Sequence, residues 1–293
     1  GEAVGPFLVM GQSGTGKKRL LRQLVLMSNR SFNFIKVEGR ATSHRYEGSN
    51  WNDLRQALEK LGDEMGISLL EEEDDLISVW NQLQGLSKEK PLLILLENAQ
   101  WFDAVSLEKV KQLEERRSQE KWQLIFTAEE PLPTSFVNFL GSLKIEKRLS
   151  QLELTNFDPS ESRALLKGEL GAIEPAVMEQ MVEWSEGSPF LLSSYIEEWK
   201  ENENLEPLPD IIQAYLSQEL GDMSSEEEAL LHYLSCFHKP ISLSILAELT
   251  ATELPVLTEL IEPLSERAIV SIVEEGEALL VQFCKQLVAM YFY

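Results

Sequence analysis

Cysteine, histidine and long apolar runs are all scarce in this sequence, and each scarcity excludes a class of protein. The 293 residues include 2 cysteines and 3 histidines, too few and too scattered for a metal-binding cluster. No apolar run approaches the ~20 residues that a membrane-spanning helix needs, and no signal peptide is evident. Cys236 and Cys284 are therefore expected to be reduced thiols in the core of a cytoplasmic protein.

Positive charge is scarce as well. The chain has 26 lysines and arginines against 49 aspartates and glutamates, which gives a formal net charge of −23. This balance argues against nucleic acid as a partner, because neutralising phosphates supplies much of the affinity of nucleic-acid-binding proteins. It argues equally against an anionic membrane surface. A hydrophobic content of 43% is ample for real cores, and the length predicts two domains or three small ones.

A glycine-rich turn near the start is the strongest motif in the chain. The apolar residues 6–10 predict a strand, and the segment from Lys17 onward predicts a helix. The turn between them follows the Gly-x-x-x-x-Gly-Lys-Ser/Thr pattern of a phosphate-binding loop, except that Lys18 replaces the final hydroxyl residue. Glycines in such a loop allow positive φ angles and bring backbone N–H groups close to phosphate oxygens. The candidate nucleotide-binding residues of the loop are Gly11, Gln12, Ser13, Gly14, Thr15, Gly16, Lys17 and Lys18.

The first turn of the predicted helix is strongly basic. Lys17, Lys18 and Arg19 lie at the end of the helix where the dipole is positive, which costs about 0.3–1 kcal/mol for each exposed cation. An anion bound among these side chains would offset that cost. The alternative is a glycine turn followed by a basic helix start that holds no ligand.

Further apolar segments predict the sheet that carries this loop. The segments predicted as strands are 33–38, 91–98, 123–127 and part of 146–154. The second of these is apolar throughout rather than alternating, which is typical of a central strand of a parallel sheet. Strands that alternate with helices predict a doubly wound parallel α/β sheet. Because ligands of such sheets bind at the carboxyl ends of the strands, the loop, Glu97 and Thr127 are expected at one edge.

Several smaller features concern helix ends and a loop. Asn50 is expected to cap the helix that follows it. The acidic run 71–75 is most simply a solvated helix start, with carboxylates at the favourable end of the dipole. Asp103 is expected to cap the next helix, and the alternative is that it replaces a missing catalytic acid. Pro131 and Pro133 mark a loop.

After Thr155 the pattern changes to helices. The expected helices of the next segment are 158–170, 173–184 and 190–201, followed by a polar linker at 202–209. Three more helices and a hairpin, in the order typical of a winged helix, complete the chain. We therefore expect a P-loop nucleotide-binding domain at 1–156, a helical lid domain at 157–205 and a winged-helix domain at 206–293.

These motifs together resemble the STAND class of signal-transduction P-loop ATPases, in particular the AAA-type ATPase modules of large bacterial regulators. The resemblance covers nearly the whole chain. It depends on four segments in order: the loop 11–18, the apolar strand with its acidic position and Trp-x-Asp at 92–103, the Gly-Ser-Pro-Phe at 187–190, and the segment 281–287 that leaves the hairpin.

The resemblance implies that ATP or ADP binds between the sheet domain and the other half of the chain, and that it sets an open or closed state. Pro189 is then expected to touch the nucleotide. Lys285, Arg40 and Arg45 are further candidates, with ordinary solvated side chains as the alternative. The resemblance also implies effector domains before the module and helical repeats after it, so both chain ends are expected to continue in a longer protein. Partners are then adjacent domains or other proteins, since an acidic winged helix would repel DNA phosphates.

The sequence departs from the family at the residues that hydrolyse ATP. Lys18 cannot ligate Mg²⁺, although Mg²⁺ binding through other groups stays possible. Glu97 occupies the position of the acid that orients the metal's water, and Asn98 replaces the second acid and cannot act as a general base. Thr127 matches the family, but the residues after it supply no arginine to stabilise the developing charge. Loss of such an arginine slows phosphoryl transfer by roughly 10³-fold or more.

The leading interpretation is a regulatory module that binds ATP or ADP and hydrolyses it very slowly or not at all, so its standing as an enzyme is open. The alternative is a nucleotide-free pseudo-ATPase that acts as a protein-interaction scaffold. A competent but slow ATPase is the third possibility.

Overall fold

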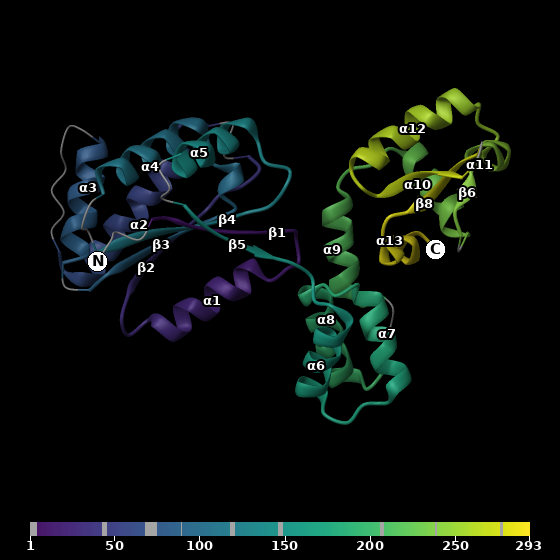
Figure 1. Cartoon of the computed structure of the whole chain (residues 1–293), viewed down its shortest axis with the longest axis horizontal. Helices are drawn as coiled ribbons and strands as arrows, with labels where there is room; N and C mark the ends of the chain where they lie inside the picture. Colours follow the sequence, from purple (N-terminus) through teal and green to yellow (C-terminus); the bar gives the residue numbers. More distant parts are fainter. Residues whose placement is uncertain are drawn as a thin grey trace. The chain divides into compact units, whose positions relative to one another are not determined.

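The computed structural model describes residues 5–42, 46–67, 75–88, 90–117, 121–145, 149–205, 208–237, 239–275 and 278–293. The chain divides into two compact units, one ending at Thr155 and the other beginning at Asn156 (Figure 1). Within the described residues, no helix has both the length and the apolar character needed to cross a bilayer.

The first unit is built on a five-stranded parallel sheet with strand order β2-β3-β4-β1-β5. Its strands are β1 (Phe7–Gly11), β2 (Asn33–Glu38), β3 (Leu92–Glu97), β4 (Trp122–Ala128) and β5 (Ser150–Leu154). Strand β3 is buried at every position, which confirms the prediction of a central strand. This parallel sheet with its helices has the P-loop NTPase-like α/β fold.

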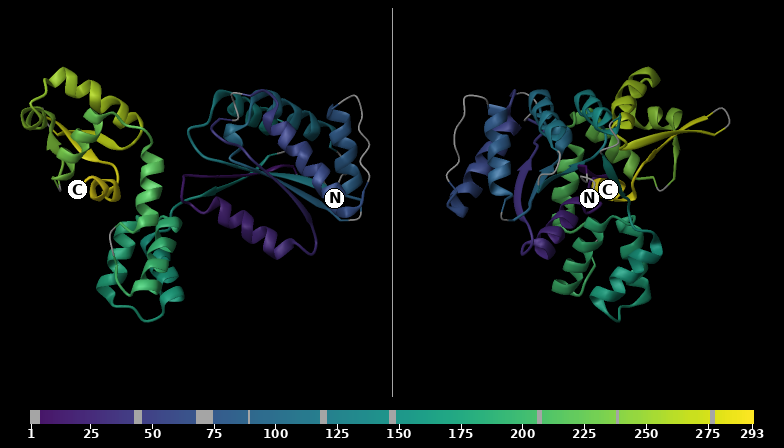
Figure 2. Two further views of the ribbon diagram at one scale, coloured as in Figure 1. Left: turned by 180° about the vertical axis from the view of Figure 1, so that it is seen from behind. Right: turned by 60° about the vertical axis from the view of Figure 1, so that its left-hand side comes forward.

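Helices cover both faces of this sheet, as Figures 1 and 2 show. Helix α1 (Lys17–Ser28) packs on one face, where Leu21 joins Val9 of β1 in a small core. The other face carries α2 (Ser49–Met65), α3 (Asp75–Leu86), the 3-10 turn η2 (Ala99–Trp101), α4 (Ala104–Arg116) and α5 (Thr134–Ile145). Leu8 and Met10 point to this larger core, because successive side chains of a strand alternate between faces.

Helix α5 was missed by the sequence analysis, which placed only a loop near Pro131 and Pro133. The helix contains Thr, Phe, Val and Gly residues whose intrinsic helix propensity is low. Its apolar side chains nevertheless recur at helical spacing, and Phe136, Phe139, Leu140 and Leu143 are all buried. Packing against the core therefore stabilises this helix despite the low helix propensity of its residues.

The second unit combines helices with a small antiparallel sheet in the order β6-β8-β7. Its helices are α6 (Pro159–Leu170), α7 (Pro175–Ser185), α8 (Pro189–Asn202), α9 (Asp210–Leu220), α10 (Ser225–Ser235), α11 (Leu243–Thr250), α12 (Leu254–Glu266) and α13 (Gln286–Phe292). Its strands are β6 (Ile241–Ser242), β7 (Val270–Glu275) and β8 (Ala278–Phe283). One apolar cluster joins residues from Leu166 to Phe292, so the expected division after residue 205 stays a prediction.

Two expectations about individual residues were wrong. Cys236 and Cys284 are free but exposed, because each lies just beyond the end of an element, where the chain turns toward solvent. The N-cap of α2 is Gly48 rather than Asn50. The Asn50 side chain is buried and accepts a hydrogen bond from the backbone of Asp103 instead. The acidic residues 71–74 lie outside the described part of the chain.

Candidate phosphate-binding site

The turn between β1 and α1 has the backbone of an anion-binding loop. Gly14 and Gly16 adopt positive φ angles of 80° and 92°, which residues other than glycine rarely adopt. Thr15 holds the turn closed by donating its hydroxyl to the carbonyl of Gln12 at 2.8 Å. Gly16 is the N-cap of α1 and has no side chain to bond the amide hydrogens of the first turn. Those amides and the positive end of the dipole are thus available to an anion.

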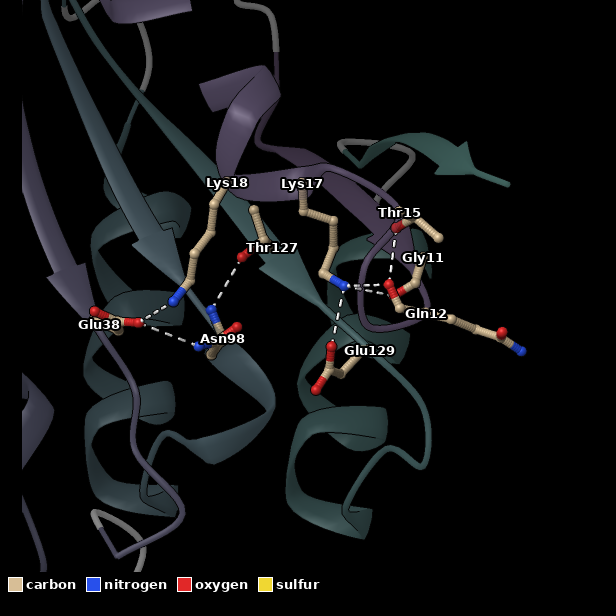
Figure 3. Close-up of polar contacts among 9 residues, drawn as sticks. All are labelled: Gly11, Gln12, Thr15, Lys17, Lys18, Glu38, Asn98, Thr127 and Glu129. Atoms are coloured by element: carbon tan, nitrogen blue, oxygen red, sulfur yellow. Dashed lines mark hydrogen bonds and ion pairs between the residues drawn. The ribbon is translucent and has the colours of Figure 1, made fainter. Parts of the chain in front are cut away.

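The loop is also closely packed at its base. A Cβ on Gly11 would lie 2.6 Å from the Thr15 hydroxyl and 2.7 Å from the carbonyl oxygen of Leu154. Neither approach is sterically tolerable, so this position requires glycine. Gln12 and Ser13 are exposed, and the side chain of Gln12 points away from Lys17 (Figure 3).

Lys17 folds back over the loop and is buried. Its Nζ donates to the carbonyl oxygens of Gly11 at 2.7 Å and Gln12 at 2.9 Å, and to Glu129 Oε2 at 3.0 Å (Figure 3). A lysine ammonium has three hydrogens to donate. All three therefore bond to the protein itself.

Lys18 has a different environment, at the open side of the site. Its Nζ donates to Glu38 Oε1 at 2.7 Å, and Asn98 Nδ2 approaches the same oxygen at 3.4 Å (Figure 3). The hydrogen bond to Glu38 raises the pKa of Lys18, and the same bond lowers the pKa of Glu38. Both groups are thus charged at neutral pH. The pair is largely exposed, so its contribution to stability is small.

The carboxyl ends of β3 and β4 complete this edge of the sheet. The backbone N–H of Asn98 donates to the Thr127 hydroxyl at 3.0 Å, which ties the two strand ends together. Asn98 has a φ of 51°, a left-handed conformation that asparagine tolerates better than most residues. Glu97 is buried, and its Oε2 lies 2.9 Å from Lys36 Nζ in an ion pair that lacks hydrogen-bond alignment.

The residues of this edge do not fit a magnesium ion in the usual way. A lysine stands at the position of the hydroxyl ligand, and the Glu97 carboxylate that was expected to act through water faces Lys36. In the described part of the chain, no group of three or more His, Cys, Asp or Glu side chains could hold a metal. We therefore derive no chemistry through a metal here, and the role of Glu97 stays a prediction.

Asp103 is confirmed as the cap of α4. Its Oδ1 accepts hydrogen bonds from the backbone of Ser106 at 2.9 Å and of Gly48 at 2.8 Å. Its Oδ2 accepts from the Ser106 hydroxyl at 2.6 Å. Burial acts to raise the pKa of Asp103, but these hydrogen bonds outweigh burial and hold the pKa below its usual value. The charged carboxylate thus joins the starts of α2 and α4.

The remaining candidates have local environments of their own. Pro189 begins α8 in the second unit, after Ser188, whose side chain caps that helix. Lys285 Nζ lies 3.6 Å from Glu219 Oε1 in an exposed pair. Arg40 is exposed, and Arg45 lies outside the described residues. Nucleotide contacts by these residues stay predictions.

Sequence reasoning missed three residues of the site: Lys36, Glu38 and Glu129. Glu38 ends β2 and Glu129 follows β4, so both lie at the carboxyl edge of the parallel sheet. The rule that placed Glu97 and Thr127 there applies to them equally. The two glutamates were overlooked because a phosphate-binding site does not require acidic residues.

Comparisons with known proteins agree with this architecture. Residues 3–135 match the family model of the AAA domain. No curated protein matches the chain significantly.

Among solved structures, the Aeropyrum pernix ORC2 protein in its ADPNP–ADP complexes is 15% identical with a TM-score of 0.57, over 99% of this chain and 88% of that one. A STAND protein with a tetratricopeptide repeat sensor from Pyrococcus horikoshii is 15% identical with a TM-score of 0.42, over 99% of this chain and 40% of that one.

The Thermotoga maritima RuvB Holliday junction branch migration motor is 16% identical with a TM-score of 0.46, over 95% of this chain and 84% of that one. At these identities the likeness concerns the fold alone, and we base no argument on the two lower TM-scores. Residues 3–135 are thus similar to AAA domains, and they lie in a unit with the P-loop NTPase-like α/β fold.

Proposed function

We propose that this chain is a regulatory module that binds ATP or ADP and hydrolyses it very slowly or not at all. The observation that carries this proposal is the loop 11–17 at the carboxyl end of β1. It has left-handed glycines, an uncapped helix start and a buried lysine folded over it. Backbone amides would hold the phosphates, and Lys17 would contact the outer ones. The match of residues 3–135 to the AAA domain supports the same ligand class.

Slow or absent hydrolysis is supported by the groups around the loop. Asn98 stands where a general base is needed, and an amide cannot accept a proton at neutral pH. Its own side chain is directed to Glu38. Beyond Thr127, the chain presents Glu129 rather than an arginine that would stabilise charge in the transition state.

The wider role rests on the resemblance stated above and on element order. The helices α10, α11 and α12, with β6, β7 and β8, follow the order of a winged helix, and we propose that they form one. Within this proposal the module is of the STAND type and responds to its nucleotide by acting on adjacent domains or protein partners in the cytoplasm. Nucleic acid is not among the proposed partners, because the net charge is −23.

The second candidate function is a scaffold that binds no nucleotide. It is favoured by one observation: the ammonium group of Lys17 is already satisfied by two carbonyl oxygens and Glu129. A nucleotide must displace at least one of these partners to reach the lysine. A site that has lost its ligand would keep such internal contacts.

Thermal unfolding with and without nucleotide separates the two functions. A ligand that binds the folded state stabilises it, by about 2.7 kcal/mol at a concentration of 100 Kd. We expect ADP to raise the unfolding midpoint in a dose-dependent way, and Lys17→Ala to abolish the rise. Lys60→Ala, which removes an exposed lysine of α2, serves as the control and keeps it.

Two other outcomes would contradict the proposed nucleotide-binding switch. Absence of both a thermal shift and a calorimetric signal with ADP and ATP would support the scaffold. Phosphate release from ATP above background, lost in Lys17→Ala, would instead establish a working ATPase.

A further inference from the structure

We propose that Glu129 makes the loop selective for a nucleoside diphosphate over a triphosphate, an inference that rests on the nucleotide-binding function proposed above. Glu129 is the first residue after β4, and the pairing of Met10 with Ala128 brings it beside the start of the loop. Its Oε2 lies 3.0 Å from Lys17 Nζ. A negative charge thus occupies the third hydrogen-bonding position of the loop lysine.

The location of this charge discriminates between phosphates. In phosphate-binding loops the backbone amides surround the inner phosphates, whereas the lysine reaches the outer ones. A carboxylate on the lysine therefore competes with the outermost phosphate and leaves the backbone cradle unobstructed. A diphosphate gains the amides of the loop, and a third phosphate adds negative charge next to Glu129.

The charge balance around the loop strengthens this effect. Three lysines face three glutamates there: Lys17 with Glu129, Lys18 with Glu38, and Lys36 with Glu97. Glu129 and Glu97 also act electrostatically on Lys18, so these groups form one cluster rather than isolated pairs. Because each of these three lysines already has a carboxylate partner, an additional phosphate must compete with a glutamate at every one of them.

The residues next to Glu129 do not compensate. They are Ala128, which pairs within the sheet, and Glu130, a second acid. The resemblance led us to expect an arginine close to this position in an active enzyme. With an acid there instead, the end of β4 disfavours the terminal phosphate that an arginine would attract.

The test is the ratio of ADP to ATP affinity, measured by calorimetry in a buffer with EDTA. We expect the wild-type chain to bind ADP at least ~10-fold more tightly than ATP, since like charges in contact are strongly unfavourable. In Glu129→Gln, ATP affinity should rise more than ADP affinity, so that the ratio falls by ~10-fold. Glu130→Gln removes the same formal charge one residue further on and should leave the ratio unchanged.

Two results would overturn the proposal: a wild-type chain that binds ATP as tightly as ADP, or a ratio that Glu129→Gln leaves unaltered. The wild-type ratio requires no variant, so a variant that fails to fold does not remove the test. If neither the wild-type chain nor Glu129→Gln binds either nucleotide, the nucleotide-binding function fails and the selectivity with it. ADP binding without the preference refutes the role of Glu129 alone.

Discussion

Two neighbouring lysines of the loop have opposite environments. Lys17 is buried and directed to the backbone of its own loop, whereas Lys18 is exposed and directed across the edge of the sheet to Glu38. Glu38 in turn approaches the Asn98 amide. An ammonium group, a carboxylate and an amide therefore meet where an active P-loop enzyme holds a hydroxyl, a metal and an acid.

Replacing Lys18 should change how the site depends on metal. We expect the ADP affinity of the wild-type chain to vary little with Mg²⁺, because the ammonium group supplies local positive charge without a metal. Lys18→Thr restores a hydroxyl ligand and frees the Glu38 carboxylate, so its ADP affinity should increase clearly on adding Mg²⁺. Calorimetry with Mg²⁺ and with EDTA measures the difference.

The control for this prediction is Arg22→Thr, which removes a positive charge from an exposed position of the same helix. It should leave the metal dependence as in the wild type. Equal dependence on Mg²⁺ in the wild-type chain and in Lys18→Thr would show that the ammonium group does not replace the metal.

At the scale of elements, the start of α4 is linked to the start of α2 through one buried carboxylate. Asp103 accepts from Gly48 on one side and from Ser106 on the other. Hydrogen bonds to a charged group contribute about 1.5–3 kcal/mol each, and a donor left unsatisfied in the core is costly. The cap therefore positions two helices on the face of the sheet that carries the larger core.

Asp103→Asn should lower the free energy of unfolding at neutral pH by about 2–3 kcal/mol, because an amide nitrogen then faces hydrogen-bond donors. The pKa of Asp103 is lowered in the folded state, so its contribution is present above the ordinary value of 3.8 and is lost as the pH falls through the folded value. The difference in the free energy of unfolding between Asp103→Asn and the wild type should thus become smaller at acid pH.

Urea unfolding followed by tryptophan fluorescence, at neutral pH and below pH 3.8, measures both effects. Asp53→Asn, at an exposed position of α2, is the matched control and should change stability by less than about 0.5 kcal/mol. If the difference in unfolding free energy between Asp103→Asn and the wild type stays constant down to acid pH, the charge of Asp103 is not what stabilises the cap.

Helix α5 and strand β3 show which elements a sequence reveals. The apolar run of β3 has one structural meaning at that length, namely a strand buried on both faces. In the α5 segment the spacing of apolar residues favours a helix, whereas the composition favours a strand, so the two sequence criteria disagree. The buried positions of Phe136 and Leu143 resolve the conflict through contacts with the sheet and its other helices.

At the scale of the whole molecule, the net charge of −23 governs encounters with other macromolecules. Nucleic acid is the class of macromolecule that this charge disfavours most directly, because phosphate neutralisation requires positive charge, so duplex DNA is the partner to test. We expect no measurable affinity for duplex DNA at physiological salt. Fluorescence anisotropy of a labelled duplex, repeated at low salt, is the measurement, and binding that persists at physiological salt would contradict the expectation.

The sequence by itself determined the loop, the parallel sheet and the cap at Asp103. Each of these depends on residues close together in the chain: a motif of eight positions, a run of apolar residues, or an acid just before a helix. Local interactions and burial on one or two faces are enough to specify such features. For the same reason, the loss of the hydroxyl at Lys18 and of the second acid at Asn98 was evident without coordinates.

Only the tertiary structure decided which charges meet. Lys17 and Glu129 are 112 residues apart, and Lys18 and Glu38 are 20 apart, yet each pair is in contact. Parallel pairing of strands brings their carboxyl ends to one edge, but register and rotamer choose the partners there. An acid on the loop lysine is a property of that register, and it turns a recognisable phosphate loop into one whose ligand must compete with the protein's own carboxylate.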